Sequence, residues 1–283
     1  MITISILMDR ITLTLFFTVI IFSCQKKERE VGLGKLTYTT SDTALYHFYR
    51  GWQQIMDEGD WTGSEASYRN SMVLDVNFLI VKSVVGRITS DSSERIALHR
   101  EINEKKSRLK GLERELLEAY NASLGYIIER DRGKSVRSET RKYYMNLSEQ
   151  TLGAITHKYP EEPYTKAEYI EFLHSLYGAQ TALDSLNILA TDKQKQLGFY
   201  ITYSALLHSE LGQYSEALSK METYLSLYSD TTFSSSDAYY AQIYFDMDSL
   251  ELARDYIEHA LVLEPNHIIA QRLKAKIEKA LLP

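Results

Sequence analysis

The chain has 283 residues, and 32 Lys and Arg against 38 Asp and Glu give it a formal net charge of −6. This mildly acidic balance argues against nucleic acid as a partner, because neutralising phosphates requires clustered Lys and Arg. A single cysteine excludes an intramolecular disulfide and a cysteine-based metal cluster.

The N-terminal segment 1–23 has the layout of a secretion signal. Its apolar run, residues 11–23, is shorter than the roughly 20 residues of a spanning helix. The sequence IFSC at residues 21–24 resembles a bacterial lipobox, although Phe22 is bulkier than the family prefers. The resemblance implies a lipoprotein signal peptide over 1–23 and lipidation of Cys24. A buried N-terminal helix with an incidental thiol is the alternative.

Residues 24–40 are predicted to form the lipidated cysteine and a flexible tether. Extended at about 3.3 Å per residue, residues 25–40 would reach about 50 Å. The sequence QKKERE at 25–30 resembles the export signals of cell-surface lipoproteins. A solvated tether without such a signal is the alternative.

The segment from residue 41 to 283 is predicted to form one continuous helical domain, since no Gly/Ser-rich or Pro-rich linker divides it. In the segment 58–77, Thr62 and Glu65 have the spacing of a capping box at the start of a helix. Apolar spacing from Ser92 to Ile128 predicts a single long amphipathic helix.

A basic segment and a proline-marked turn follow. Residues 130–142, RDRGKSVRSETRK, form either an anion-binding loop or a solvated turn between helices. Pro160 and Pro163 mark a turn before a predicted hairpin over 164–189.

An internal repeat is clearest near the C-terminus, where segments 210–225 and 246–261 align at an offset of 36 residues. The alignment sets Ala217 against Ala253 and the larger apolar residue Met221 against Ile257. Looser copies place Ser64 and Tyr68 of segment 58–77, and Ala182 and Leu186 of segment 178–189, at the same positions.

This pattern resembles the second helix of a tetratricopeptide repeat, in which small side chains let paired helices approach closely. Ala253, Ala260 and Pro265 match the family's Ala, Ala and Pro spacing. The resemblance implies an all-α fold, a tetratricopeptide-like right-handed α-solenoid of about six helical hairpins. A capping helix, roughly Ile268 to Leu282, would end the stack.

No catalytic or metal-binding motif in the sequence is complete. GKS at 133–135 lacks the earlier glycine of a phosphate-binding loop, because Ile128 stands in its place. Asp246 and Asp248 lack the glycine and glutamate of a calcium loop, and we expect them to cap the following helix. We expect no enzymatic activity, no cofactor and no metal site. The 21 tyrosines fit either sugar-stacking platforms or the tyrosines of a tetratricopeptide core.

The resemblance also implies a partner-binding surface, because the family lines a concave groove with the first helix of each pair. Tyr49 and Phe245 are the predicted anchors of an extended, basic or amide-rich peptide. The groove-facing positions transferred to this chain are Tyr49, Gln53, Met56, Asp57, Glu171, His174, Thr202, Leu206, Glu210, Gln242, Phe245 and Asp246.

Together these features favour a non-catalytic envelope lipoprotein that acts as a protein–protein interaction scaffold. It would be held by its lipid, on either face of the outer membrane, and would bind a protein or an extended peptide. One alternative is a structural subunit of outer-membrane assembly machinery. Another is a nutrient-capturing lipoprotein of the starch-utilisation type, although those chains are usually longer.

Replacing the predicted lipidation site tests the anchoring hypothesis. Cys24→Ser should abolish labelling by a fatty-acid probe and leave an uncleaved precursor, because the modified thiol is absent. Labelling of the variant, or none of the wild type, would contradict the lipoprotein interpretation.

Overall fold

The computed structural model describes residues 39, 41–133, 138–228 and 233–282. The predicted signal peptide, Cys24 and nearly all of the tether lie outside the described residues, as do residues 134–137 of the basic segment. All described residues belong to one compact unit, Val31–Pro283. None of the helices described is long and apolar enough to cross a bilayer.

The described residues form thirteen α-helices and no strand. Three short helical turns accompany them, the π-helix η1 (Gln54–Glu58) and the 3-10 helices η2 (Lys106–Arg108) and η3 (Gln194–Gln196). The α-helices are α1 (Asp42–Gln53), α2 (Trp61–Leu74), α3 (Leu79–Ile88), α4 (Ser92–Lys105), α5 (Gly111–Asp131), α6 (Ser138–Lys158), α7 (Pro163–Tyr177), α8 (Ala179–Leu189), α9 (Gly198–Glu210), α10 (Tyr214–Leu227), α11 (Ser235–Asp246), α12 (Leu250–Leu263) and α13 (Ile268–Leu281).

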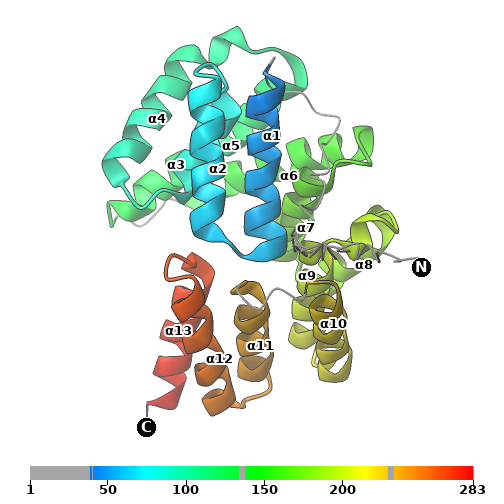
Figure 1. Cartoon of the computed structure of the whole chain (residues 1–283). Coiled ribbons are helices and arrows are strands. Elements are labelled where there is room, and N and C mark those ends of the chain that lie inside the picture. Colours follow the sequence, from blue (N-terminus) through cyan, green and yellow to red (C-terminus); the bar gives the residue numbers. More distant parts are fainter. Residues whose placement is uncertain (1–38, 40, 134–137, 229–232, 283) are drawn as a thin grey trace, which may run out of the picture. The chain divides into compact units, whose positions relative to one another are not determined.

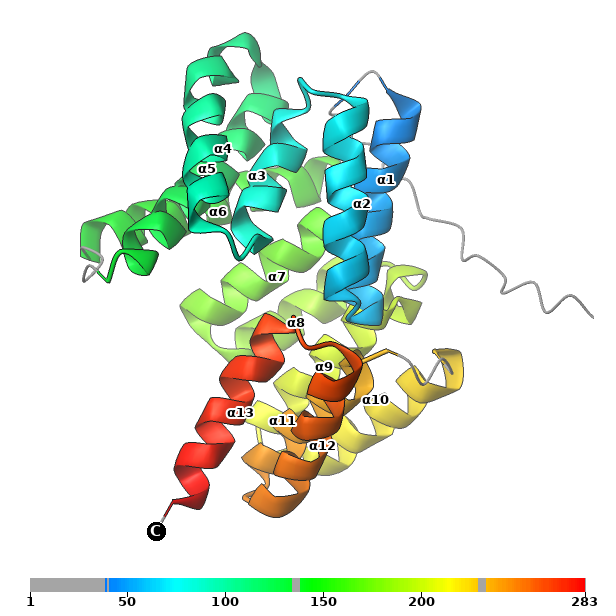
Figure 2. The same ribbon diagram turned by 60° about the vertical axis from the view of Figure 1, so that its left-hand side comes forward.

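Successive helices pack in pairs, α1 with α2 through α11 with α12, and α13 packs on the last pair (Figure 1, Figure 2). The predicted all-α architecture of six hairpins and a final helix is confirmed, and α13 ends within one residue of the expected position. Each hairpin buries apolar residues against its neighbours, as expected of a helical-repeat stack.

The alignment of the repeats is confirmed by burial. In α10, Ala217, Met221 and Tyr224 are at most 1 % exposed, and in α12 their aligned partners Ala253, Ile257 and Ala260 are 0 % exposed. Because Ala217 and Ala253 are small, the paired helices approach closely there and leave no space for a larger side chain. The aligned residues of the earlier copies, Ser64, Tyr68, Ser71 and Ala182, are fully buried as well.

The prediction of one helix from Ser92 to Ile128 is wrong. The chain leaves α4 at Lys105, passes through η2 and begins α5 at Gly111. Gly111 has a φ of +57°, in the left-handed region that glycine adopts without steric cost. A continuous apolar periodicity therefore spans two helices that pack against each other.

Two predicted helix caps are also wrong. Asp60, not Thr62, caps α2, since its carboxylate accepts a hydrogen bond from the Gly63 amide at 2.7 Å. Glu65 instead pairs with Arg69 one turn later. At α12, the N-terminal residue Ser249 makes no side-chain cap and neither Asp246 nor Asp248 replaces it.

The turn between α1 and α2 contacts helices far along the chain. Asp57 in η1 is 2 % exposed. Its carboxylate accepts hydrogen bonds from the Phe199 amide of α9 at 2.9 Å and the Tyr164 hydroxyl of α7 at 3.1 Å. Its backbone carbonyl accepts one from the Tyr224 hydroxyl of α10 at 2.9 Å. This turn is thus fixed by helices of two other hairpins, α7–α8 and α9–α10.

The start of α2 also contacts the connection between α12 and α13. The Glu264 carboxylate accepts hydrogen bonds from the amide and the hydroxyl of Thr62, both at 2.9 Å. The Asn266 side chain donates to the same hydroxyl at 3.1 Å, and the rings of Trp61 and His267 lie 5.4 Å apart. The first hairpin therefore touches the connection that leads into the last helix.

Overpacking the last hairpin tests the repeat alignment. Ala253→Leu should lower the free energy of unfolding by about 1–3 kcal/mol, because the added atoms have no space. Ala275→Leu, at an exposed position of α13, is the matched control and should be nearly neutral. Equal melting temperatures of the two purified variants would contradict the alignment.

Candidate functional site

A cavity of about 580 Å³ lies on the inner side of the stack. All seven odd-numbered helices, α1 to α13, contribute residues to its wall, and α2, α4 and α6 add a few more. Its volume lies within the range of ligand sites in proteins, about 300–1,000 Å³. The expectation that the first helix of each pair faces a common concave surface therefore holds for this cavity.

Aromatic rings make much of the cavity wall. Tyr126 and Tyr144 stack with their centroids 5.6 Å apart, and Phe199 and Tyr203 stack at 4.8 Å. Trp61 adds a further ring from α2. Because these rings hold one another in place, the wall is preorganised, and little side-chain entropy would be lost when a ligand binds.

Arg87, at the end of α3, brings a charge into the cavity. Its Nη2 donates a 2.8 Å hydrogen bond to Glu168 Oε1, and its guanidinium carbon lies 4.8 Å from the centroid of the Tyr120 ring. The Tyr120 hydroxyl donates to the other Glu168 oxygen. Arg87 Nη1 is buried and has no hydrogen-bond acceptor among the described residues. Both oxygens of Glu168 thus accept a hydrogen bond, whereas the N–H groups of Arg87 Nη1 have no acceptor.

Glu171, one turn further along α7, also lines the cavity. Burial raises its pKa to about 8, the negative charge of Glu168 adds to the rise, and the positive charge of Arg87 opposes it. Below that pH the carboxyl group is neutral and can donate a hydrogen bond.

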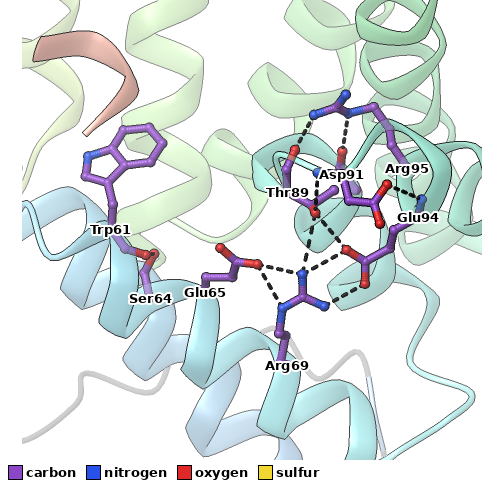
Figure 3. Close-up of polar contacts among 9 residues, drawn as sticks. Trp61, Ser64, Glu65, Arg69, Thr89, Asp91, Glu94 and Arg95 are labelled. Carbon is purple, nitrogen blue, oxygen red and sulfur yellow. Dashed lines mark hydrogen bonds and ion pairs between the residues drawn. The ribbon is translucent and has the colours of Figure 1, made fainter. Parts of the chain in front are cut away.

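An ion-pair network holds the connection between α3 and α4 at one edge of the cavity (Figure 3). Arg69 of α2 pairs with Glu65 and with Glu94, each at 2.6 Å. The bond to Arg69 is the main reason why the pKa of Glu94 falls to about 2. Arg95 donates to the Thr89 carbonyl and also pairs with a carboxylate on α5. Its N–H groups are therefore engaged within the protein.

Four of the predicted partner-binding residues, Met56, Glu171, Leu206 and Gln242, line the cavity. Whether they contact a partner stays a prediction.

Four other predicted positions do not face open space. Tyr49, Gln53, Asp57 and Thr202 are at most 5 % exposed. Tyr49, for example, donates a 2.7 Å hydrogen bond to the buried Glu162. Their transfer from the family pattern as groove-facing residues is wrong, because here neighbouring hairpins cover these faces of α1 and α9.

The remaining predicted residues lie outside the cavity wall and are bonded to one another or to the core. The His174 ring bonds to Glu210 and to Tyr203, each at 2.8 Å. Asp246 accepts hydrogen bonds from Ser209 and from Gln242, and Phe245 packs against the core of the last hairpin.

The expected preference for a basic peptide rested on four acidic residues, of which only Glu171 lines the cavity. Asp57, Glu210 and Asp246 are absent from its wall, whereas four arginines line it: Arg87, Arg95, Arg130 and Arg272. The sequence signal for Arg87 is a lone arginine near the end of the apolar segment LIVKSVVGRI. That segment belongs to no aligned repeat, so the family pattern predicts no binding residue there.

Among the described residues, no group of three or more His, Cys, Asp and Glu side chains is placed to hold a metal ion.

Comparisons with known proteins give similarity at the level of the fold. No family model and no curated protein matches the sequence. Among solved structures, the chain is similar to one in the crystal structure of the APC/C hetero-tetramer Cut9-Hcn1, with 13 % sequence identity and a TM-score of 0.40. The similarity covers 83 % of this chain and 43 % of that chain, so this chain spans less than half the length of the protein it matches. A similarity this low gives no ground for assigning a partner or an activity of that protein to this chain.

The raised pKa of Glu171 predicts a pH-dependent stability. An ordinary glutamate has a pKa of 4.5, so between there and about pH 8 the folded chain keeps a proton that the unfolded chain loses. The free energy of unfolding therefore falls as pH rises through this window. Glu171→Gln stays neutral, and we expect it to be more stable than the wild type above pH 8.

Urea unfolding at a series of pH values measures this difference. The advantage of Glu171→Gln should vanish as the pH falls towards 4.5, and Glu104→Gln, at an exposed position of α4, should show no such trend. A difference that does not change with pH would contradict the account of Glu171.

Proposed function

We propose that this protein is a non-catalytic interaction scaffold whose cavity binds a segment of a protein partner. The single observation that carries the proposal is that every first helix of the stack contributes to one preformed cavity. Rigid aromatic rings and arginine side chains, which dominate binding energy in protein interfaces, line it together.

We further propose that the scaffold works in the cell envelope. The support is the lipobox-like sequence ending at Cys24. A lipid there, with the tether 24–40, would hold the helical body at the surface of the outer membrane and leave its cavity open to a partner.

Site-specific photocrosslinking in cells tests the scaffold proposal. A benzophenone amino acid at Leu206 or Gln242, both in the cavity wall, should give a discrete protein adduct on irradiation. The same group at Ile188, which is 80 % exposed on α8, is the control and should give none. Identical adducts from both places, or none from the cavity positions, would contradict the proposal.

A further inference from the structure

The cavity carries the opposite charge balance from the chain as a whole. The chain has a formal net charge of −6, yet four arginines and only two glutamates, Glu168 and Glu171, line the cavity. Glu168 is already paired with Arg87. Glu171 is neutral below about pH 8, because burial raises its pKa. The cavity is therefore locally positive at neutral pH.

Arg87 supplies the strongest single indication of a ligand. Its Nη2 is bonded to Glu168, but its buried Nη1 has no acceptor among the described residues. A buried donor that has lost water and found no partner is unfavourable, and an incoming acceptor would relieve that cost. Since a charged donor bonds most strongly to a charged acceptor, an oxyanion fits best.

The surroundings of Arg87 favour a carboxylate over a phosphate group. The Glu168 carboxylate is bonded to Nη2, directly beside the unpartnered Nη1. A phosphate dianion would be repelled by Glu168 more strongly than a singly charged carboxylate, and it would require several donors. The neutral Glu171 could donate to a carboxylate as well.

Two further arginines suit an extended ligand rather than a single small anion. Arg130 has a side chain that is 46 % exposed, with one weak bond of 3.3 Å to Asp131. Arg272, on α13, is exposed, and no carboxylate of the described residues lies within ion-pair distance of it. These side chains belong to α5 and α13, so positive charge is distributed across the cavity wall.

We propose that the cavity binds an extended acidic peptide segment, one carboxylate of which accepts a hydrogen bond from Arg87 Nη1 while others pair with Arg130 and Arg272. The inference rests on the proposed scaffold function and specifies the partner's chemistry. The aromatic rings between these arginines would contact the apolar parts of the segment.

A displayed library of random peptides tests the proposal on the purified helical protein. Peptides retained by the wild type, and not by a Leu206→Trp variant whose larger, uncharged side chain fills part of the cavity, should be enriched in Asp and Glu over the input library. Both tryptophans of the chain, Trp52 and Trp61, line the cavity. Binding of selected peptides that lack tryptophan can therefore be followed by intrinsic fluorescence.

Peptide analogues and protein variants then identify the contacts. Replacing Glu by Gln in a selected peptide should weaken binding by at least about tenfold. Arg130→Ala with Arg272→Ala, which leaves the core intact, should weaken binding similarly, and so should Arg87→Lys, which keeps a cation beside Glu168. Arg100→Ala, exposed on α4 outside the cavity wall, is the matched control and should bind normally.

Several results would overturn the inference. Selected peptides that are neutral or basic, or that bind equally after Glu is replaced by Gln, would leave a peptide-binding scaffold without the acidic preference. A phosphoserine analogue that binds at least about tenfold more tightly than the glutamate peptide would assign the site to phosphate. If the Leu206→Trp variant retains the same peptides, the cavity is not the binding site, and the scaffold proposal fails too.

Discussion

The buried carboxylate of Asp57 is the contact on which the rest of the structure depends. It lies in the π-helical turn of the first hairpin and accepts hydrogen bonds from α7 and α9. Gly198 makes the close approach possible, because a Cβ atom there would meet the Asp57 carbonyl oxygen at 2.5 Å. A buried charge of this kind is tolerated only where its acceptor sites are satisfied. The turn is therefore fixed in one position.

This fixed turn brings together hairpins that are not neighbours in the repeat stack. In a simple solenoid each hairpin contacts only its neighbours, and the concave face stays open. Here the first hairpin also contacts α9, α10 and the connection before α13. Residues from every odd-numbered helix line one cavity. A cavity formed before the ligand arrives reduces the ordering cost of binding.

The sequence predicts the repeating part of this structure and not its closure. Alanine spacing predicts the paired helices, because Ala217 and Ala253 are each buried at the contact between the two helices of their own hairpin. The contact between Thr62 and Glu264 joins residues 202 positions apart and leaves no periodic signal. For the same reason, the repeat pattern places Tyr49 and Asp57 in an open groove, although other hairpins cover them. Arg87 has no counterpart in the repeat pattern, because the apolar segment around it matches no repeat.

Disulfide trapping between the first and last hairpins tests the closure most directly. Thr62→Cys and Asn266→Cys, in a Cys24→Ser background that removes the only native thiol, place two cysteines where side chains now bond at 3.1 Å. Mild oxidation should give an intramolecular disulfide, seen as a reductant-sensitive shift on a non-reducing gel. Two thiols that stay free and react fully with a maleimide, in a protein that keeps its helical content, would show an open stack and contradict the account.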